Sequence, residues 1–303
     1  VEKNTGRKMK TFERAEFLDL CRDTIEEYTQ AMRETAARVG LSCDFDKEYL
    51  TDSDEYRGVS QSIFVDLFKR GDIVEDLRPN IYDPVEGTTI ADAEVERLRR
   101  KSKLIDIRWT TEDGVDVVIS TTRPELICAC GVVVVHPDDD RYQHLIGKKI
   151  VLPVETEGRS KSVEITTHPS VKSEFGSGVL MVCSFGDQND VAVFRELGLM
   201  PFQAIDLEGN MTEVSGPYVG MKVAEERERI IDDLSSANRI VNIIEKEQDV
   251  PVSERGKNPV EIILLKEWYV RQTHIQDRMR ELIEDMEFHP IRNKQFLLDW
   301  MDN

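Results

Sequence analysis

Three short segments of the chain carry side chains that could do chemistry. The first is Ser-Thr-Thr-Arg-Pro-Glu at 120–125, where hydroxyls, a guanidinium and a carboxylate follow an alternating apolar run. Donors and acceptors gathered at the end of a strand can hold a polar ligand. A strand edge followed by a proline turn has the same composition, so this segment alone leaves both interpretations open.

The second segment is Phe-Gly-Ser-Gly at 175–178, directly before the apolar run 179–182. Two glycines one residue apart allow the backbone to approach a ligand closely. By itself the segment is weak evidence of a site. The third glycine of a dinucleotide-binding fingerprint is absent, and a strand is expected where that fingerprint needs a helix.

The third segment is Asp-Gln-Asn-Asp at 187–190, which follows the run 179–182 and opens a predicted helix. Carboxylates three residues apart on a helix lie on the same side, so both can face one ligand. The alternative is structural, with Asp187 or Asn189 accepting hydrogen bonds from the first-turn amides. Capping and ligand contact are compatible.

Other kinds of site find no support in the sequence. Cys128 and Cys130 lack the spacing of a zinc ligand pair, and the five histidines are scattered. Neither a G-x-S-x-G elbow nor a phosphate-binding G-x₄-G-K-[ST] loop occurs. We therefore expect no metal, no serine nucleophile and no nucleotide triphosphate site in this chain.

The elements that must position the three segments differ along the chain. Apolar residues at spacings of three and four predict a helix over 18–36, with Thr11 as its N-cap and Gly40 at its end. The same spacing predicts a second helix over 56–67 that ends at Gly71. The first hundred residues are therefore expected to be helical.

From about residue 101 the apolar period changes to two. The runs 105–109 and 115–119 flank Glu-Asp-Gly at 112–114 and predict a β-hairpin. Further predicted strands are 132–135, 149–154, 163–167, 179–182 and 260–265, and further predicted helices are 190–197, 223–234 and 275–286. Short strands with few helices indicate the α+β class.

We therefore predict a compact β-barrel-like domain carried on helix-rich flanking segments. Its expected extent is 101–250. A helix-rich flank is expected over 1–100, and a returning strand and helix over 251–303.

Composition restricts the possible partners. With 40 Lys and Arg against 59 Asp and Glu, the formal net charge is −19, which argues against a general binder of nucleic-acid backbones. No apolar run approaches the roughly 18 residues of a membrane-spanning helix. Five cysteines without paired spacing predict reduced thiols and a cytoplasmic protein. The chain starts at Val1 without a Met, so we expect a fragment of a longer protein.

Taken in order, the three segments resemble a known family. STTRPEL at 120–126 and FGSGVLMVCSFGDQND at 175–190 are similar to the editing domain that class I aminoacyl-tRNA synthetases of valyl, isoleucyl and leucyl type carry as an insertion. The resemblance is strongest to the archaeal valyl type. It covers essentially the whole chain, including IADAEVERL at 90–98 and SERGKNPVEIILLKEWYVRQ at 253–272. The family's ATP-site motifs, HIGH and KMSKS, are missing, so this fragment is not expected to activate an amino acid.

The resemblance implies a role for each matching residue. Asp190 matches the aspartate that holds the ammonium of the misattached amino acid, and Asp187 matches the acidic position that recognises the threonine hydroxyl. Asp190, Thr121 and Thr122 are the expected catalytic residues. The expected substrate-binding residues are Asp187, Arg123, Glu125, Leu126, Phe175, Gly176, Gly178 and Met181, with those at 175–178 lining the pocket for the terminal adenosine.

The sequence departs from the family pattern at several positions. Leu126 stands where the motif often ends in Thr, and Met181 stands where many bacterial valyl-type enzymes have a basic residue. The cysteines of the family's zinc knuckles are also missing, with Asp83-Pro84 and Gly256 in those regions. We predict no zinc.

The resemblance implies hydrolysis of the ester of threonyl-tRNA(Val). The expected partners are the 3′ end of that tRNA and the remainder of the synthetase, with no membrane and no DNA. Editing is expected to need no cofactor, whereas ATP and Mg serve the valine-attaching parent at sites outside this fragment. Three alternatives remain: an isoleucyl- or leucyl-type editing domain, a non-enzymatic module that binds nucleosides or amino acids, and an unrelated hydrolase with an acidic pair.

Overall fold

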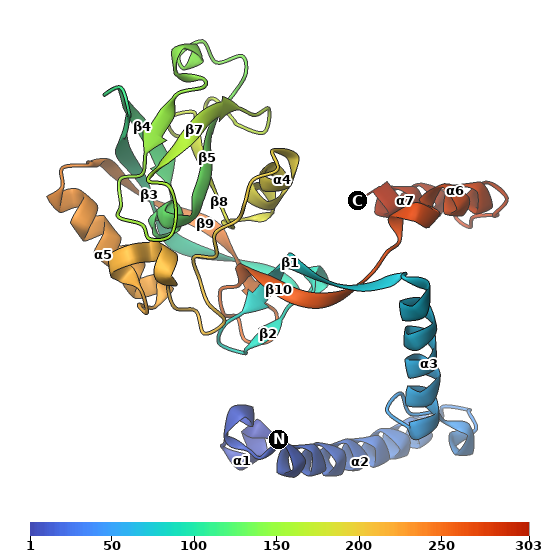
Figure 1. Cartoon of the computed structure of the whole chain (residues 1–303). Helices are drawn as coiled ribbons and strands as arrows, with labels where there is room; N and C mark the ends of the chain where they lie inside the picture. Colours follow the sequence, from blue (N-terminus) through green and yellow to red (C-terminus); the bar gives the residue numbers. More distant parts are fainter. Residues whose placement is uncertain (303) are drawn as a thin grey trace. The chain divides into compact units, whose positions relative to one another are not determined.

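The computed structural model describes residues 1–302, and of Lys10 the backbone alone. The chain forms two compact units, Val1–Ile73 with Arg271–Asn303 and Val74–Val270. Figure 1 labels the helices and most of the strands. Our division of the sequence at residues 100 and 250 stays a prediction about domain organisation.

The first unit is helical. Its helices are α1 (Glu2–Thr5), α2 (Arg14–Arg38), α3 (Asp54–Arg70), α6 (Gln276–Glu284) and α7 (Arg292–Asp302), with 3₁₀ turns at Met9–Thr11, Phe45–Lys47 and Thr273–Ile275. Helices α2 and α3 confirm the two predicted near the N-terminus, and α3 ends at Gly71, whose φ of 79° is left-handed. No helix among residues 1–302 has the length and apolar character needed to cross a membrane.

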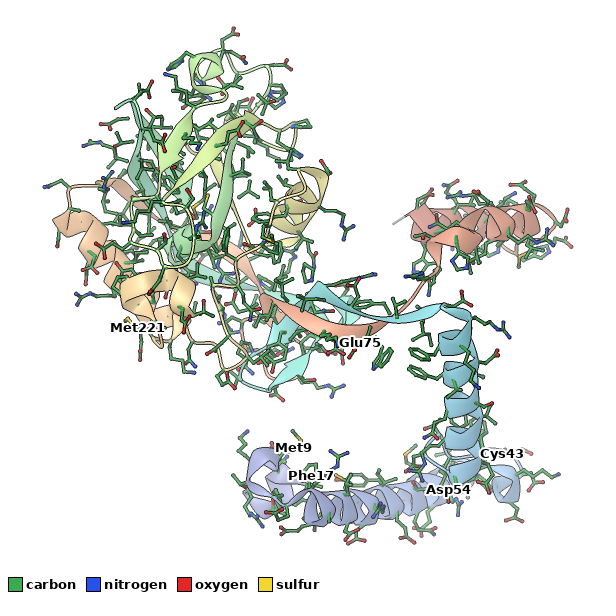
Figure 2. The ribbon with its side chains drawn as sticks, in the orientation of Figure 1. Met9, Phe17, Cys43, Asp54, Glu75 and Met221 are labelled. Carbon is green, nitrogen blue, oxygen red and sulfur yellow. The ribbon has the colours of Figure 1, made fainter. Side chains whose placement is uncertain are left out.

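The start of α2 differs from the prediction. The helix begins after Glu13, and Thr11 lies in the preceding 3₁₀ turn, where its hydroxyl donates to the Lys8 carbonyl. Thr11 is therefore not the N-cap, because its hydroxyl closes a turn of its own. The loop between α2 and α3 carries Cys43, which is exposed (Figure 2). All five cysteines are free thiols, and Cys128, Cys130 and Cys183 are buried.

The strands belong to the second unit, apart from the first residue of β1. They are β1 (Ile73–Asp83), β2 (Thr88–Thr89), β3 (Val95–Thr111), β4 (Asp116–Thr121), β5 (Cys130–Val135), β6 (Lys149–Val151), β7 (Ser162–Thr167), β8 (Val179–Cys183), β9 (Ile240–Ser253) and β10 (Glu261–Val270). Two α-helices, α4 (Gln188–Glu196) and α5 (Val223–Ser236), and 3₁₀ turns at Asp92–Glu94, Pro124–Ala129, Gln143–Leu145 and Glu213–Tyr218 complete the unit.

The expectation that the first hundred residues are helical is wrong from residue 73 onward. Strand β1 and the first part of β3 occupy most of that stretch, and β3 pairs with β9 along its whole outer half, from Val95 opposite Ser253 to Leu104 opposite Ile244. Backbone hydrogen bonds and cross-strand side-chain pairs hold this charged, largely exposed ribbon together. Because neither face of this β3–β9 ribbon is packed on a core, its sequence lacks the alternation of apolar and polar residues by which a half-buried strand is recognised.

The main sheet has the order β4-β3-β6-β7-β5-β8, with β9 on β3. Only β5 and β7 pair in parallel, and β3 and β4 form the predicted hairpin, with Ile107 opposite Ile119. The two ends of the order, β4 and β8, lie beside each other, so the sheet curls into a half-barrel (Figure 1). The predicted α+β class with a barrel-like sheet is confirmed.

Two apolar cores pack the helices of the second unit against its main sheet. Trp109, Ile119 and Leu126 belong to the larger core under α5, and Val182, Phe185 and Phe194 to the smaller one under α4. Each such buried side chain stabilises the fold by about 1.5–3 kcal/mol. Strand β8 contributes to both cores, because its side chains alternate between its two faces.

One buried carboxylate joins two loops beside the small sheet β10-β1-β2. Asp83 is fully buried, and its Oδ1 accepts hydrogen bonds from the amides of Val85 and Glu86. Its Oδ2 accepts from the Ser253 hydroxyl at 2.6 Å and from the Asn258 amide nitrogen at 3.1 Å. Burial opposes ionisation, but these hydrogen bonds outweigh it and lower the pKa of Asp83. No group of three or more His, Cys, Asp or Glu among residues 1–302 could hold a metal ion.

Replacing Asp83 with Ala should lower the free energy of unfolding by about 2–4 kcal/mol, because four donors, among them the hydroxyl of the buried Ser253, lose their acceptor. Urea denaturation of Asp83→Ala and wild type measures this. Asp92→Ala, at an exposed 3₁₀ position, is the control. A loss of stability no larger than in Asp92→Ala would contradict the stabilising role of Asp83. A fall in the wild-type melting temperature on adding EDTA would show that a metal ion, and not the hydrogen bonds of Asp83 alone, holds the two loops together.

Candidate active site

The exit of β4 is shaped by a tight turn. Thr121 is buried at the end of the strand, and its Oγ1 accepts a hydrogen bond from the Arg123 amide at 3.0 Å. Pro124 then opens the 3₁₀ turn Pro124–Ala129, where its fixed φ suits the first helical position. No acceptor for the Thr121 hydroxyl proton occurs among residues 1–302, so this hydroxyl can donate to a ligand.

A network of buried charges holds this turn in place. Glu125 has no exposed surface, and Arg123 Nε donates to its Oε1 at 2.8 Å. From α5, Arg227 donates through Nε to Oε2 at 2.9 Å and through Nη2 to Oε1 at 2.6 Å. Arg123 Nη2 also donates to Glu261 Oε2 of β10 at 2.7 Å. Burial raises the pKa of Glu125, but the two guanidinium groups outweigh it and hold the pKa below its usual value.

Asp190 lies in the first turn of α4, facing the exit of β8. Its Oδ2 accepts hydrogen bonds from the amides of Gly186 at 2.9 Å and Cys183 at 3.4 Å. No partner for Oδ1 occurs among the described residues. A Cβ placed on Gly186 would lie 2.6 Å from this carboxylate and 3.5 Å from Leu126 Cδ1, so the β8 exit and the 3₁₀ turn after β4 meet here.

The charge state of Asp190 depends on its surroundings. Burial, and after it the negative charge of Asp187, raise the pKa of Asp190 to about 7. The amides of Gly186 and Cys183 and the positive charge of Arg123 act in the opposite direction. A carboxylate with a pKa shifted this far by burial and a neighbouring charge is typical of a functional site.

Asp187 is the N-cap of α4. Its Oδ1 accepts from the amides of Asn189 at 2.8 Å and Asp190 at 3.0 Å, which confirms the capping role considered from the sequence. The side chain is exposed, and its Oδ2 has no hydrogen-bond partner among residues 1–302. One oxygen can therefore cap the helix while the other contacts a ligand.

The glycine segment lies on the face of β4. Gly176 and Gly178 have left-handed φ values of 57° and 80°, and a Cβ on Gly176 would lie 2.6 Å from Ser120 Oγ. Glycine is needed at both positions. Phe175 is 52% exposed and lines a cavity of about 150 Å³ beside Ser120, with Lys246 Nζ 5.0 Å from the ring centroid.

Some of the site residues predicted from the sequence lie close together near the start of α4, and others lie in different parts of the unit. Around the β4 and β8 exits lie Thr121, Arg123, Glu125, Leu126, Asp187 and Asp190. Thr122 lies on the wall of a separate cavity of about 450 Å³ that Arg227 also lines. Met181 is buried in the larger core. Phe175, Gly176 and Gly178 lie over Ser120.

Arg227 and Glu261 were not predicted. They are more than 100 residues from the turn they hold, and nothing in their local sequence distinguishes them from ordinary surface charges. In chemical terms the gathered residues offer one carboxylate oxygen for a cation, one for a hydroxyl, and a threonine hydroxyl as donor.

Comparison with known proteins places the chain in a family. It belongs to the class I tRNA synthetases, since the model of the family "tRNA synthetases class I (I, L, M and V)" matches residues 1–303. It is 38% identical to a valine–tRNA ligase of Methanocaldococcus jannaschii over 100% of this chain and 34% of the relative. For the valine–tRNA ligase of Nanoarchaeum equitans the identity is 36%, over 97% of this chain and 38% of the relative. The valine–tRNA ligase of Aeropyrum pernix is 37% identical over 96% of this chain and 35% of the relative. The chain spans about a third of the length of these relatives.

The titration of Asp190 tests the geometry of the site. Replacing Asp187 with Asn keeps a good N-cap but removes the neighbouring negative charge, so the pKa of Asp190 should fall from about 7. Carboxyl ¹³C NMR of the labelled chain measures the midpoint. Asp206→Asn, in which a similar turn-capping carboxylate is neutralised, is the control. An unchanged midpoint in Asp187→Asn would contradict the coupling of the two carboxylates.

Proposed function

We propose that this chain is the editing region of a valyl-type synthetase and hydrolyses the ester of threonyl-tRNA(Val). The observation that carries the proposal is the pair of carboxylates on the first turn of α4. Asp190 is half-buried with one oxygen free, Asp187 is exposed with one oxygen free, and both lie in the segment that follows β8. The similarity to valine–tRNA ligases supports the choice of amino acid.

The physical need for such a site follows from the amino acids. An apolar pocket rejects threonine in favour of valine by only about a hundredfold, a value established for valyl enzymes. A second site that requires the hydroxyl separates the two, because valine would leave a polar group of the site unpaired. Asp187 Oδ2 offers an acceptor for that hydroxyl.

The roles of the other residues follow from their contacts. Ionised Asp190 pairs through Oδ1 with the substrate ammonium, which fixes the ester carbonyl. The Thr121 hydroxyl donates a hydrogen bond to the developing oxyanion. Arg123 supports Thr121 through its amide while its side chain stays bound to Glu125 and Glu261. The ester is already activated, so a positioned water suffices, with the free ribose hydroxyl relaying its proton.

The proposed site handles only the 3′ end of the tRNA. An acidic chain can bind that end locally, since the group recognised is a cation. The net charge of −19 on the chain opposes tight binding to the phosphate backbone of the tRNA. In the full-length parent, ATP, Mg and the remaining tRNA contacts belong to regions outside this chain.

Replacing Asp190 with Ala should lower deacylation of threonyl-tRNA(Val) roughly a hundredfold or more, because an ammonium–carboxylate contact is lost. In the wild type, kcat/KM should rise with pH through about 7, as Asp190 ionises. Both are measured by release of radiolabelled threonine. Full activity of Asp190→Ala would contradict the proposal.

Replacing Asp187 with Ala should reduce the preference for threonine over valine at least tenfold, since the acceptor for the hydroxyl is removed. A panel of threonyl-, valyl-, isoleucyl- and leucyl-tRNAs measures the selectivity of wild type and variant. Asp187→Asn, which keeps the cap, separates loss of selectivity from loss of the helix start. Unchanged selectivity would remove Asp187 from its role, and wild-type preference for another ester would favour an isoleucyl- or leucyl-type site.

A further inference from the structure

Three of the five cysteines lie in the apolar core beside the candidate site, and the proposed reaction uses none of their thiols. Cys128 is in the 3₁₀ turn after β4, Cys130 begins β5 and Cys183 ends β8. None of the three is more than 2% exposed. Cys130 and Cys183 are opposite each other in the antiparallel β5–β8 ladder, so two nucleophilic side chains face each other in register.

The hydrogen bonds around this pair show that it is of the close, non-hydrogen-bonded kind. The two kinds of pair alternate along an antiparallel ladder. The Ser184 amide donates to the Ala129 carbonyl at 3.1 Å, so the hydrogen-bonded pair is the adjacent one. The Cys183 amide donates instead to Asp190 of α4. The Cα atoms of a non-hydrogen-bonded pair lie about 4.5 Å apart, within the range of about 4.4–6.8 Å that a disulfide spans.

A guanidinium lies beside the two thiols. Arg159 donates through Nη1 to the Cys128 carbonyl at 2.7 Å and through Nη2 to the Cys130 carbonyl at 2.5 Å. Burial lowers the pKa of Arg159, and the charges that oppose this effect are those of ionised Cys130, Cys128 and Cys183. Among residues 1–302 it has no carboxylate partner. A cation in this position stabilises a thiolate when one forms.

Both thiols are protonated in the reduced protein. Burial, and then the hydrogen bond with the Cys130 thiol, raise the pKa of Cys183 well above its usual value. Cys130 Sγ donates to the Val132 carbonyl at 3.4 Å. Because the thiolate is the nucleophile, the pair reacts slowly. Strand β8 stands at one end of the sheet order, so its last residues can open to a small reagent while the rest of the sheet stays paired.

We propose that Cys130 and Cys183 are an oxidation site, at which a hydroperoxide converts the two thiols to a disulfide that slows the proposed reaction. The disulfide itself is independent of the proposed function, whereas its effect on deacylation rests on it.

The oxidation proceeds in two balanced steps when hydrogen peroxide is the oxidant. The sulfur of one deprotonated thiol attacks a peroxide oxygen, the O–O bond breaks, and a sulfenic acid and one water form. The sulfur of the second thiol attacks the sulfenic sulfur, and the S–S bond forms as the S–O bond breaks. The hydroxide released takes the proton of the second thiol and leaves as water. Two thiols are oxidised, and one peroxide is reduced to two waters.

The disulfide acts on the candidate site through the exit of β8. The Cβ atoms of a cross-strand pair lie about 4.5–5.5 Å apart, whereas a disulfide needs about 3.5–4.5 Å, so β8 has to approach β5 by roughly 1 Å. The Cys183 amide moves with its strand, and its long hydrogen bond of 3.4 Å to Asp190 Oδ2 is lost. A displacement of about 1 Å can slow catalysis up to about a hundredfold.

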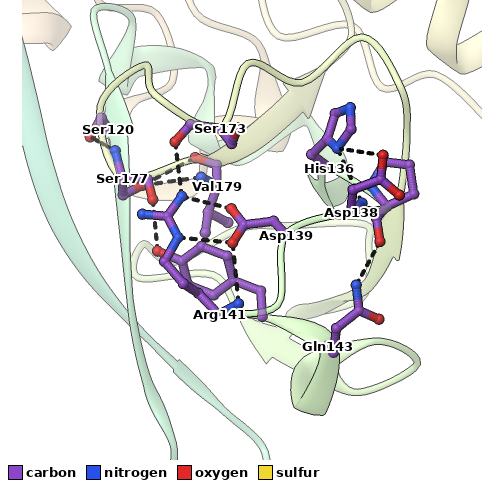
Figure 3. Close-up of polar contacts among 11 residues, drawn as sticks. Ser120, His136, Asp138, Asp139, Arg141, Gln143, Ser173, Ser177 and Val179 are labelled. Atoms are coloured by element: carbon purple, nitrogen blue, oxygen red, sulfur yellow. Dashed lines mark hydrogen bonds and ion pairs between the residues drawn. The ribbon is translucent and has the colours of Figure 1, made fainter.

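The other end of β8 does not take up the movement, because the loop before it is anchored. Arg141 Nη2 donates to Asp139 Oδ2 at 2.6 Å and to the Ser173 carbonyl at 2.8 Å (Figure 3). The Tyr142 hydroxyl donates to the Ser177 carbonyl at 2.7 Å. The displacement is therefore confined to the exit of β8, where the two carboxylates of α4 follow.

The test treats the folded chain with hydrogen peroxide. Cys21 and Cys43, the two thiols that are not buried, are replaced with Ser in every protein. Peptide mass spectrometry should show a disulfide between Cys130 and Cys183, and release of threonine from threonyl-tRNA(Val) should slow at least tenfold. Dithiothreitol should reverse both changes.

Matched variants separate this pair from other oxidation. Cys130→Ala should keep its deacylation rate after peroxide, because the disulfide cannot form. Cys128→Ala, which removes a buried thiol that is out of register with β8, should stay as sensitive as the wild type. Arg159→Gln should slow disulfide formation about tenfold, the effect of one pKa unit on the thiolate population. Arg229→Gln, which removes an exposed guanidinium paired with Asp233, should not.

Each outcome decides either the inference or the function beneath it. A folded wild type that forms no Cys130–Cys183 disulfide, or forms it only in urea, would overturn the oxidation site. Unchanged deacylation in the disulfide form, or equal inactivation of Cys130→Ala, would overturn its effect on the site and leave the proposed function intact. A disulfide that forms in a wild type without ester hydrolysis would support the oxidation site and reject the proposed hydrolysis.

Discussion

The carboxylate of Glu125 is the group on which the arrangement of the site depends. It has no contact with solvent, and burying such a charge costs several kcal/mol unless its hydrogen bonds are complete. Arg123 from the β4 exit and Arg227 from α5 complete them, and Arg123 reaches on to Glu261 of β10. Three elements distant in sequence are therefore fixed to one another by the need to compensate a single buried charge.

The same network explains the protonation of its neighbour. Glu226 is buried beside Glu125, and neither of its oxygens has a hydrogen-bond partner in the structure, which describes residues 1–302. Burial, and then the charge of Glu125, raise the pKa of Glu226 to about 8. The pKa values of Glu125 and the half-buried Asp190 are shifted in opposite directions. Two guanidinium groups lower the pKa of Glu125, whereas Asp190 faces two backbone amides and its pKa is raised. Environment, not residue type, decides which carboxylate is structural and which can change its charge.

Local signals predicted much of the fold and part of the site. The hairpin 105–119, the end of α3 at Gly71 and the start of α4 at Asp187 depend on turn and cap residues that are visible in the sequence. Strand β9 and the outer half of β3 pair with each other although at least 140 residues separate the paired positions, and neither alternates clearly enough to be predicted alone. Asp187 and Asp190 could be predicted because they lie at a helix start that the local sequence marks. Arg227 and Glu261 were missed because each lies more than 100 residues from the turn that it contacts.

The central claim is that the first turn of α4 recognises a threonyl group by its ammonium and its hydroxyl. Calorimetric titration of the chain with non-hydrolysable amide analogues of threonyl- and valyl-adenosine tests it most directly. At pH 8, where Asp190 is ionised, the threonyl analogue should bind at least tenfold more tightly than the valyl analogue. Equal affinity for the two analogues, or no binding of either, would contradict the account.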